Sequence, residues 1–111
     1  MRLRLSLPIT HQGAAIDSIV SSGCIIGGGT VVKSILSPGV SIQKDALVEE
    51  SILFPNVTIG PGAKVRRAII EKGLHIPAGF QIGYDLERDK KLFHVTESGI
   101  VVLAKDTIIK A

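Results

Sequence analysis

Three histidines and one cysteine are the residues of this 111-residue chain best suited to acid–base, nucleophilic or metal chemistry. His11, His75 and His94 show neither HxxxH nor HExxH spacing, so a zinc site would need ligands from separate segments or separate chains. Cys24 has no second cysteine to pair with and fits a small core residue better than a nucleophile. The GGG at 27–29 lacks the Lys-Ser/Thr that completes a phosphate loop. We therefore expect no catalytic residue, no metal site and no cofactor in this chain.

Basic residues in the second half of the chain are the remaining candidates for chemistry. Arg66 and Arg67 are followed by Lys72 and, near the C-terminus, by Lys105 and Lys110. If these cations lie at one end of the molecule, they can hold an anion, although a solvated surface also explains them. The formal charge of only +3, the absence of a basic run and the 4% aromatic content argue against nucleic acid as a partner.

The composition predicts one small domain rich in β-strands. Isoleucine (16) and valine (10) dominate a 45% hydrophobic fraction, and both favour strands. The sequence has no 18-residue apolar run and therefore predicts no membrane span. Met1–Thr10 alternates arginine with leucine and lacks the apolar stretch of a targeting signal. Together with the single cysteine, this leads us to expect a cytoplasmic location.

A fourfold repeat organises the middle of the chain. Residues 18–84 divide into segments of 16, 17, 17 and 17 residues: SIVSSGCIIGGGTVVK (18–33), SILSPGVSIQKDALVEE (34–50), SILFPNVTIGPGAKVRR (51–67) and AIIEKGLHIPAGFQIGY (68–84). Three columns of large apolar residues recur about six positions apart: Val20/Leu36/Leu53/Ile70, Ile26/Ile42/Ile59/Ile76 and Val32/Val48/Val65/Ile82. The residues two positions before each column fall on the same side of a strand: Ser18/Ser34/Ser51/Ala68, Cys24/Val40/Val57/Leu74 and Thr30/Ala46/Ala63/Phe80. All six columns are expected to point inward.

Two further columns mark sharp corners, because their residues tolerate left-handed backbone angles: Gly23/Gly39/Asn56/Gly73 and Gly29/Asp45/Gly62/Gly79. Short strands joined by such corners cannot bury an apolar side alone, so the repeats must stack into a three-sided parallel β-solenoid of about four coils. A helical fold is excluded, because glycine and proline recur about every six residues.

Outward residues distinguish the three faces. On the first face they are Ile19, Ile35, Ile52 and Ile69; on the others they are Ile25/Ser41/Thr58/His75 and Val31/Leu47/Lys64/Gln81. An exposed column of four isoleucines is typical of an interface with another domain or subunit. Alternatively, β-branched residues simply suit the surface of a sheet.

The repeats are flanked by two different segments. Residues 1–17 form a lead-in before the coils at 18–84, and residues 85–111 form a cap. In the cap, the charged stretch at 85–92 suits a turn or two of helix, while 93–96 and 99–104 flank ESG as a closing hairpin. We expect one all-β domain with this short irregular or helical segment and a C-terminal hairpin.

The six-residue rhythm resembles the hexapeptide repeats of left-handed β-helices. More specifically, residues 13–106 resemble the C-terminal domain of bacterial glucose-1-phosphate adenylyltransferases, also called ADP-glucose pyrophosphorylases. The resemblance is carried by AAIDSIVSSGCII (14–26), VRRAIIEKGLHIPAGFQIG (65–83) and above all the exit FHVTESGIVVLAK (93–105), where a generic hexapeptide protein would continue to coil. Residues 1–12 match the linker of that family poorly, which suggests a shortened or altered start at Met1.

The resemblance implies a structural and regulatory role. That family transfers AMP from ATP to glucose 1-phosphate with Mg²⁺, making ADP-glucose and pyrophosphate for glycogen synthesis, and catalysis belongs to an N-terminal nucleotidyltransferase domain that is absent here. Its β-helix packs on that domain and on a neighbouring subunit of a homotetramer, and sugar-phosphate or nucleotide effectors bind between the two domains. The effector cations of the family correspond to Lys72 and Lys105, where arginine is usual, and lysine lacks the bidentate fork of arginine.

Other members of the hexapeptide class are alternatives. An acyltransferase would need a histidine base, more coils and a protruding loop, and a γ-type carbonic anhydrase would need several histidines on adjacent coils, whereas only His75 lies within the repeats. A stand-alone structural binding module also fits the sequence.

Overall fold

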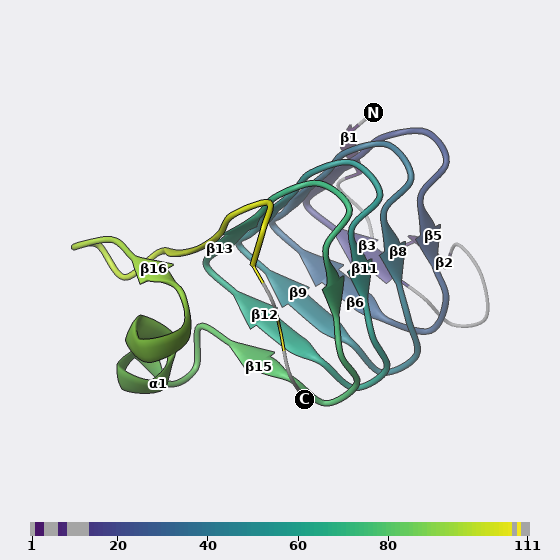
Figure 1. The fold of residues 1–111 in the computed structure, drawn as a ribbon. Helices are drawn as coiled ribbons and strands as arrows, with labels where there is room; N and C mark the ends of the chain where they lie inside the picture. Colours follow the sequence, from purple (N-terminus) through teal and green to yellow (C-terminus); the bar gives the residue numbers. More distant parts are fainter. Residues whose placement is uncertain (1, 4–6, 9–13, 108, 110–111) are drawn as a thin grey trace.

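Parallel strands stack into a three-sided solenoid in the computed structural model, which describes residues 2–3, 7–8, 14–107 and 109 (Figure 1). Each coil contributes one short strand to each face, and strands of successive coils pair in parallel. The predicted four-coil β-solenoid is confirmed. None of the described helices is long and apolar enough to cross a membrane.

Three sheets form the three faces, and each is ordered by coil. The first face comprises β1 (Arg2–Leu3), β4 (Ser18–Val20), β7 (Ile35–Leu36), β10 (Ile52–Leu53), β13 (Ala68–Ile70), β17 (Val101–Leu103) and β16 (His94–Val95). The second face comprises β5 (Ile25–Ile26), β8 (Ser41–Ile42), β11 (Thr58–Ile59) and β14 (His75–Ile76). The third face comprises β2 (Leu7–Pro8), β3 (Ala14–Ile16), β6 (Thr30–Val32), β9 (Leu47–Glu49), β12 (Lys64–Arg66) and β15 (Gln81–Ile82). Parallel stacking thus begins at β3, while β1 and β2 of the lead-in pair antiparallel with β4 and β3.

The core lies inside the triangle of sheets, where the columns predicted for the first and second faces meet. Leu36, Leu53 and Ile70 on the first face and Ile42 and Ile59 on the second are completely buried. Alternation along each strand sends the residue between two inward positions to the surface.

The third face of the first coil departs from the predicted register by one residue. Val31, expected outward, is completely buried and pairs with Val48, whereas Val32, expected inward, pairs with Glu49. The first coil is one residue shorter than the others, and the residue is missing at the GGG corner. Outward positions on this face are therefore Thr30, Leu47, Lys64 and Gln81.

The same shift corrects the corner column. Gly28, with φ +88°, takes the left-handed corner position, and its carbonyl accepts from the N–H of Asp45 in the next coil. Gly29, predicted for that corner, is instead buried, and a Cβ there would lie 2.6 Å from Cγ2 of Ile42. Glycine is needed at 29 because the interior has no room for a side chain.

A third left-handed corner joins the third face to the first without using glycine. Asp17, Lys33, Glu50 and Arg67 have φ between 46° and 50°. Immediately after this corner, Ser18, Ser34 and Ser51 are buried and form a stack that we call the serine ladder. Each Oγ donates to the carbonyl two residues earlier and accepts the backbone N–H at the equivalent position of the next coil, at 2.8–3.2 Å. The polar column that faces the core is thereby fully hydrogen-bonded.

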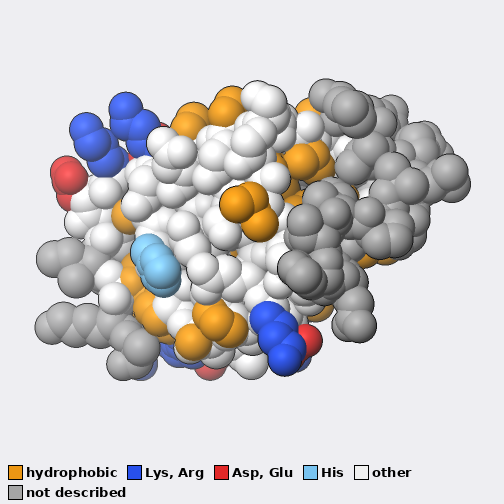
Figure 2. Space-filling view, turned by 90° about the vertical axis from the view of Figure 1, so that its right-hand side faces the viewer, with side chains coloured by type: hydrophobic (Ala, Val, Ile, Leu, Met, Phe, Trp, Pro, Cys, Tyr) orange, Lys and Arg blue, Asp and Glu red, His pale blue; other side chains and the backbone are white. Residues whose placement is uncertain are grey.

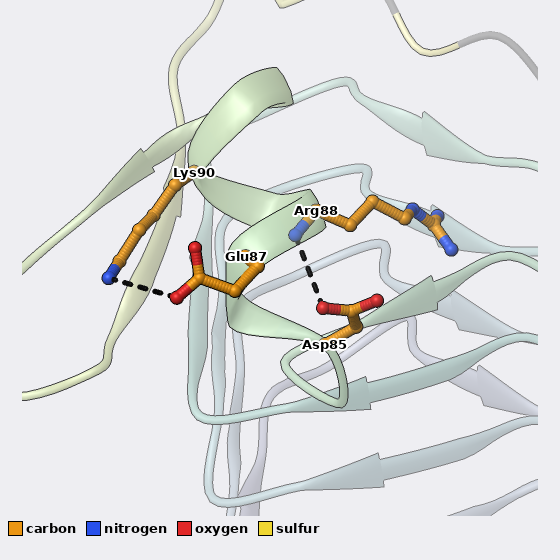
Figure 3. Close-up of polar contacts among 4 residues, drawn as sticks. All are labelled: Asp85, Glu87, Arg88 and Lys90. Atoms are coloured by element: carbon orange, nitrogen blue, oxygen red, sulfur yellow. Dashed lines mark hydrogen bonds and ion pairs between the residues drawn. The ribbon is translucent and has the colours of Figure 1, made fainter.

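The C-terminal cap contains the expected helix and hairpin. Asp85 caps the N-terminus of helix α1 (Leu86–Leu92), because its carboxylate accepts the N–H of Arg88 at 3.2 Å, and the helix carries a Glu87–Lys90 ion pair at 3.9 Å (Figure 3). Strand β16 then pairs antiparallel with β17, and β17 pairs in parallel with β13. The hairpin therefore supplies a fifth strand in the parallel run on the first face, with Val101 and Leu103 buried as the next inward pair.

Candidate functional site

The four outward isoleucines of the first face stand in one line. Ile19, Ile35, Ile52 and Ile69 are successive register partners in β4, β7, β10 and β13, and we call them the isoleucine ladder. Val102 of β17 pairs with Ile69 and continues the column. The sheet therefore presents an unbroken apolar line along the coils.

Exposure falls along this line toward the cap. Ile19 and Ile35 are each 42% exposed, whereas Ile52 and Ile69 are half-buried. Ile100 of the hairpin lines a surface hollow with Ile52 and Ile69, and the lining also includes Glu50, Arg67 and Ala68. The open part of the ladder thus lies in the first two coils.

The structure brings the two predicted effector lysines to one corner. Ile70 and Leu103 are register partners, and the N–H of Glu71 donates to the carbonyl of Leu103 at 3.0 Å. Lys72 lies two residues after Ile70, and Lys105 lies two residues after Leu103. The two lysines therefore occupy the same position in adjacent coils, which are about 4.8 Å apart. Both are exposed. We call this pair the lysine corner.

Arg66 and Arg67 do not join the lysine corner. They lie before β13, at the corner between the third and first faces, whereas Lys72 follows β13. The cationic cluster considered from the sequence is therefore split across the first face. Lys110, its last member, lies outside the described residues.

Arg66 belongs to a small network with Tyr84, Gly83 and Glu49. The guanidinium of Arg66 lies over the Tyr84 ring, 4.4 Å from its centroid, and its Nη2 donates to the Gly83 carbonyl at 3.1 Å. The hydroxyl of Tyr84 donates to Oε1 of Glu49 at 3.1 Å. Burial, followed by this hydrogen bond, raises the pKa of Tyr84, so the hydroxyl remains a proton donor at neutral pH.

His75, His94 and Cys24, which the structure describes, do not form a metal site. His75 is exposed on the second face and His94 is exposed in β16, while His11 lies outside the described residues. Cys24 packs against the core, and its Sγ donates to the Ser37 carbonyl at 3.2 Å. Within the described part of the chain, no group of three or more His, Cys, Asp or Glu side chains is placed to hold a metal ion.

Among the described residues, the outward side chains of the strands of the second face are uncharged apart from a histidine. Figure 2 views the molecule from the side that carries β5 and β8, and outside the grey region it shows separate apolar side chains and a histidine, with charged side chains toward the edges. The outward residues of this sheet are Ile25, Ser41, Thr58 and His75. The candidate sites therefore lie on the first face and at its two corners.

Sequence reasoning missed a buried carboxylate in the cap. Asp89 is 1% exposed, and its Oδ2 accepts the N–H of Gly83 at 2.9 Å. Burial raises the pKa of this carboxyl, against the smaller opposing effect of the Gly83 N–H. In the sequence, Asp89 is one of several charged residues of DLERDKKL, and only its place on the inner side of α1 distinguishes it.

Comparison with known proteins covers both the coils and the hairpin. A sequence family described as GlmU-like, C-terminal hexapeptide matches residues 8–103. The glucose-1-phosphate adenylyltransferase of Anaeromyxobacter sp. (strain Fw109-5) is 61% identical over 93 residues, which cover 84% of this chain and 23% of that protein. Proteins of the same name from Koribacter versatilis (86% of this chain, 23% of that protein) and Frankia casuarinae (91% and 25%) are each 49% identical, over 96 and 102 residues. The chain thus spans about a quarter of the length of these relatives.

Proposed function

Because this chain belongs to the GlmU-like C-terminal hexapeptide family, we propose that it is the oligomerisation and regulatory domain of a glucose-1-phosphate adenylyltransferase. The 61% identity to a protein of that name, over 84% of this chain, carries the proposal. In this proposal the parent enzyme is cytoplasmic and converts ATP and glucose 1-phosphate into ADP-glucose and pyrophosphate for glycogen synthesis. Its N-terminal nucleotidyltransferase domain performs the chemistry and holds Mg²⁺.

The isoleucine ladder is the proposed docking surface of this domain. Ile19 and Ile35 leave 42% of their surface in water although they stand in register on one flat face. Covering such a line removes apolar surface from water at about 25 cal/mol per Å². We assign it to the nucleotidyltransferase domain or to a neighbouring subunit of a homotetramer.

The lysine corner is the proposed binding site for an anionic effector. Lys72 and Lys105 place two ammonium groups in adjacent coils on an exposed corner, and a sugar phosphate or a nucleotide provides the complementary charge. An effector bound between this corner and a second domain changes activity only if it contacts two states of the enzyme differently.

Immunodepletion from the source cells tests the proposal. An antibody raised against the 111-residue chain should remove the activity that forms ADP-glucose from ATP and glucose 1-phosphate, and the precipitate should contain that activity. An antibody against an unrelated protein is the control. If the chain is captured while all of the activity stays in the supernatant, this domain is not part of that enzyme.

A further inference from the structure

A polar hollow lies at the corner between the third and first faces, on the opposite side of β13 from the lysine corner. It encloses about 410 Å³, within the ~300–1,000 Å³ range of small-molecule sites. We call it the arginine hollow, and the residues that line it are Glu50, Arg66, Arg67, Gly83, Tyr84, Leu86 and Gly99. Glu50 and Arg67 also line the hollow beside the isoleucine ladder, but the function proposed above assigns no role to the arginine hollow.

Both guanidinium groups are held in place before any ligand arrives. Arg66 is fixed by the Tyr84 ring and the Gly83 carbonyl. Arg67 starts from a left-handed backbone with φ 50°, and its Nη2 donates to the carbonyl of Ser98 at 2.8 Å. An arginine has five N–H donors, and each of these side chains uses one in these bonds, so donors remain for an oxyanion. Binding an anion here therefore needs little additional ordering of side chains.

Two glycines allow the backbone to line the hollow. Gly83 has φ +90°, and a Cβ there would collide with the carbonyl oxygen of Arg66. Gly99 has φ +84° and lies against Leu86. The chain thus passes close to both guanidinium groups without side chains that would fill the space between the coils and the hairpin.

The charges of the hollow select the class of ligand. The lining includes two arginines and one glutamate, Glu50, and so carries one net positive charge, while the neighbouring Glu49 carboxylate accepts the Tyr84 hydroxyl. Arginine forks match the oxygens of phosphate, while the Glu50 carboxylate repels a second anionic group and accepts hydrogen bonds from hydroxyl groups. We propose that the arginine hollow binds a single phosphate group, either as inorganic phosphate or as the monoester of a small hydroxylated molecule.

An amide-resolved NMR titration of the full 111-residue chain tests this assignment. Sodium phosphate, glycerol 1-phosphate and succinate are added separately at pH 7 and constant ionic strength. We expect saturable shifts at Arg67, Gly83 and Gly99 with phosphate, with glycerol 1-phosphate, or with both, and the stronger response identifies the source of the phosphate group. No saturable shift at these amides, or a response to succinate alone, overturns the proposal.

Matched variants locate the site. Arg67→Gln should weaken phosphate binding at least tenfold, and Arg67→Lys, which keeps the charge but loses the fork, should weaken it less. Arg88→Gln is the control, because Arg88, like Arg67, is exposed and donates from Nη2 to a backbone carbonyl, that of Gln81, but does not line the hollow. Circular dichroism melting of each variant verifies that it is folded.

The lysine corner must behave independently if the assignment is correct. A Lys72→Ala and Lys105→Ala double variant should retain the phosphate response at Gly83 and Gly99. Loss of the response in this double variant together with its retention in Arg67→Gln would place the anion at the lysine corner and overturn the proposal. The NMR titration does not depend on whether the complete enzyme responds to effectors. A failure of the proposed function can therefore be told apart from a failure of the phosphate assignment.

Discussion

Individual hydrogen bonds decide how polar residues are accommodated inside this solenoid. The serine ladder turns a polar column into a continuous chain of contacts, because each Oγ both donates and accepts. Asp89 is accommodated differently, since a single backbone N–H faces a carboxylate that burial disfavours in its charged form. The two arrangements predict different responses to substitution.

Ser34→Ala should lower the free energy of unfolding by about 1–3 kcal/mol, because it leaves the buried N–H of Ser51 without its acceptor. Urea denaturation followed by circular dichroism measures the change. Ser41→Ala is the matched control, since Ser41 lies at an outward position of the second face, and its substitution should have an effect within about 0.5 kcal/mol. Equal losses in the two variants would contradict a role for the serine ladder in stability.

Asp89→Asn should become more stabilising relative to the parent chain as the pH rises. The pKa of Asp89 is raised in the folded chain, so its contribution to stability is fully present below the ordinary aspartate pKa of about 3.9 and is lost as the pH rises through the folded value. Asparagine keeps an acceptor for the N–H of Gly83 and has no charge to bury. Urea denaturation of both proteins from pH 4 to pH 7 gives the difference, and a flat or falling difference would contradict the raised pKa.

The register of each strand depends on the length of the corner that precedes it. The 17-residue period placed the strands of the second, third and fourth coils correctly from sequence, because their inward columns are aliphatic apart from Ser34, Ser51 and Phe80. The prediction for the first coil was wrong at Val31 and Val32, because both residues are valine and either can point inward. Counting forward from Ile26 selects Val32, whereas counting back from Ser34 selects Val31, and the lack of room beside Gly29 decides between the two registers.

Gly29→Ala should destabilise the chain by about 1–3 kcal/mol, as is typical of added volume in a packed interior. The new Cβ would lie 2.6 Å from Cγ2 of Ile42 and 2.8 Å from the Gln43 carbonyl oxygen. Gly27→Ala is the control, because the nearest atoms to its Cβ would be 4.0 Å away. Thermal melting of the two variants compares them, and a Gly29→Ala chain as stable as Gly27→Ala would contradict the observed register.

How far each candidate site could be predicted from the sequence depends on whether its residues lie at repeating positions. The isoleucine ladder and the pairing of Lys72 with Lys105 depend on register within the repeats or on a hairpin strand that continues them. The arginine hollow depends on how α1 and the hairpin fold back beside the coils, and this brings Tyr84 and Ser98 to Arg66 and Arg67. Contacts of that kind leave no periodic signal in the sequence.

In the described part of the chain, the solenoid presents the isoleucine ladder on one face, with the lysine corner and the arginine hollow on either side of it. In the full-length protein, Ile52→Asp should disrupt assembly, because it places a charge in the middle of the isoleucine ladder. Light scattering after size exclusion should show a smaller species than the parent. Thr58→Asp, on the second face, is the control, and an unchanged assembly in both variants would remove the ladder from the interface.

Lys72→Ala in the full-length protein should reduce the response to effectors. The expected readout is the rate of ADP-glucose formation with a sugar phosphate or an adenine nucleotide divided by the rate without it, and this ratio should approach one. Lys64→Ala is the matched control, because Lys64 is an exposed lysine on the third face. An equal ratio in parent and Lys72→Ala would exclude Lys72 from the effector site.

The mass of the native protein in its source cells tests the central claim most directly. An antibody against this chain, used on a denaturing gel of a fresh extract, should detect a band several times heavier than the 11.8 kDa of this sequence. Such a band is expected because the matched region makes up 23% of the Anaeromyxobacter relative. A single band near 11.8 kDa would leave no nucleotidyltransferase domain on the same chain and would contradict the proposed role.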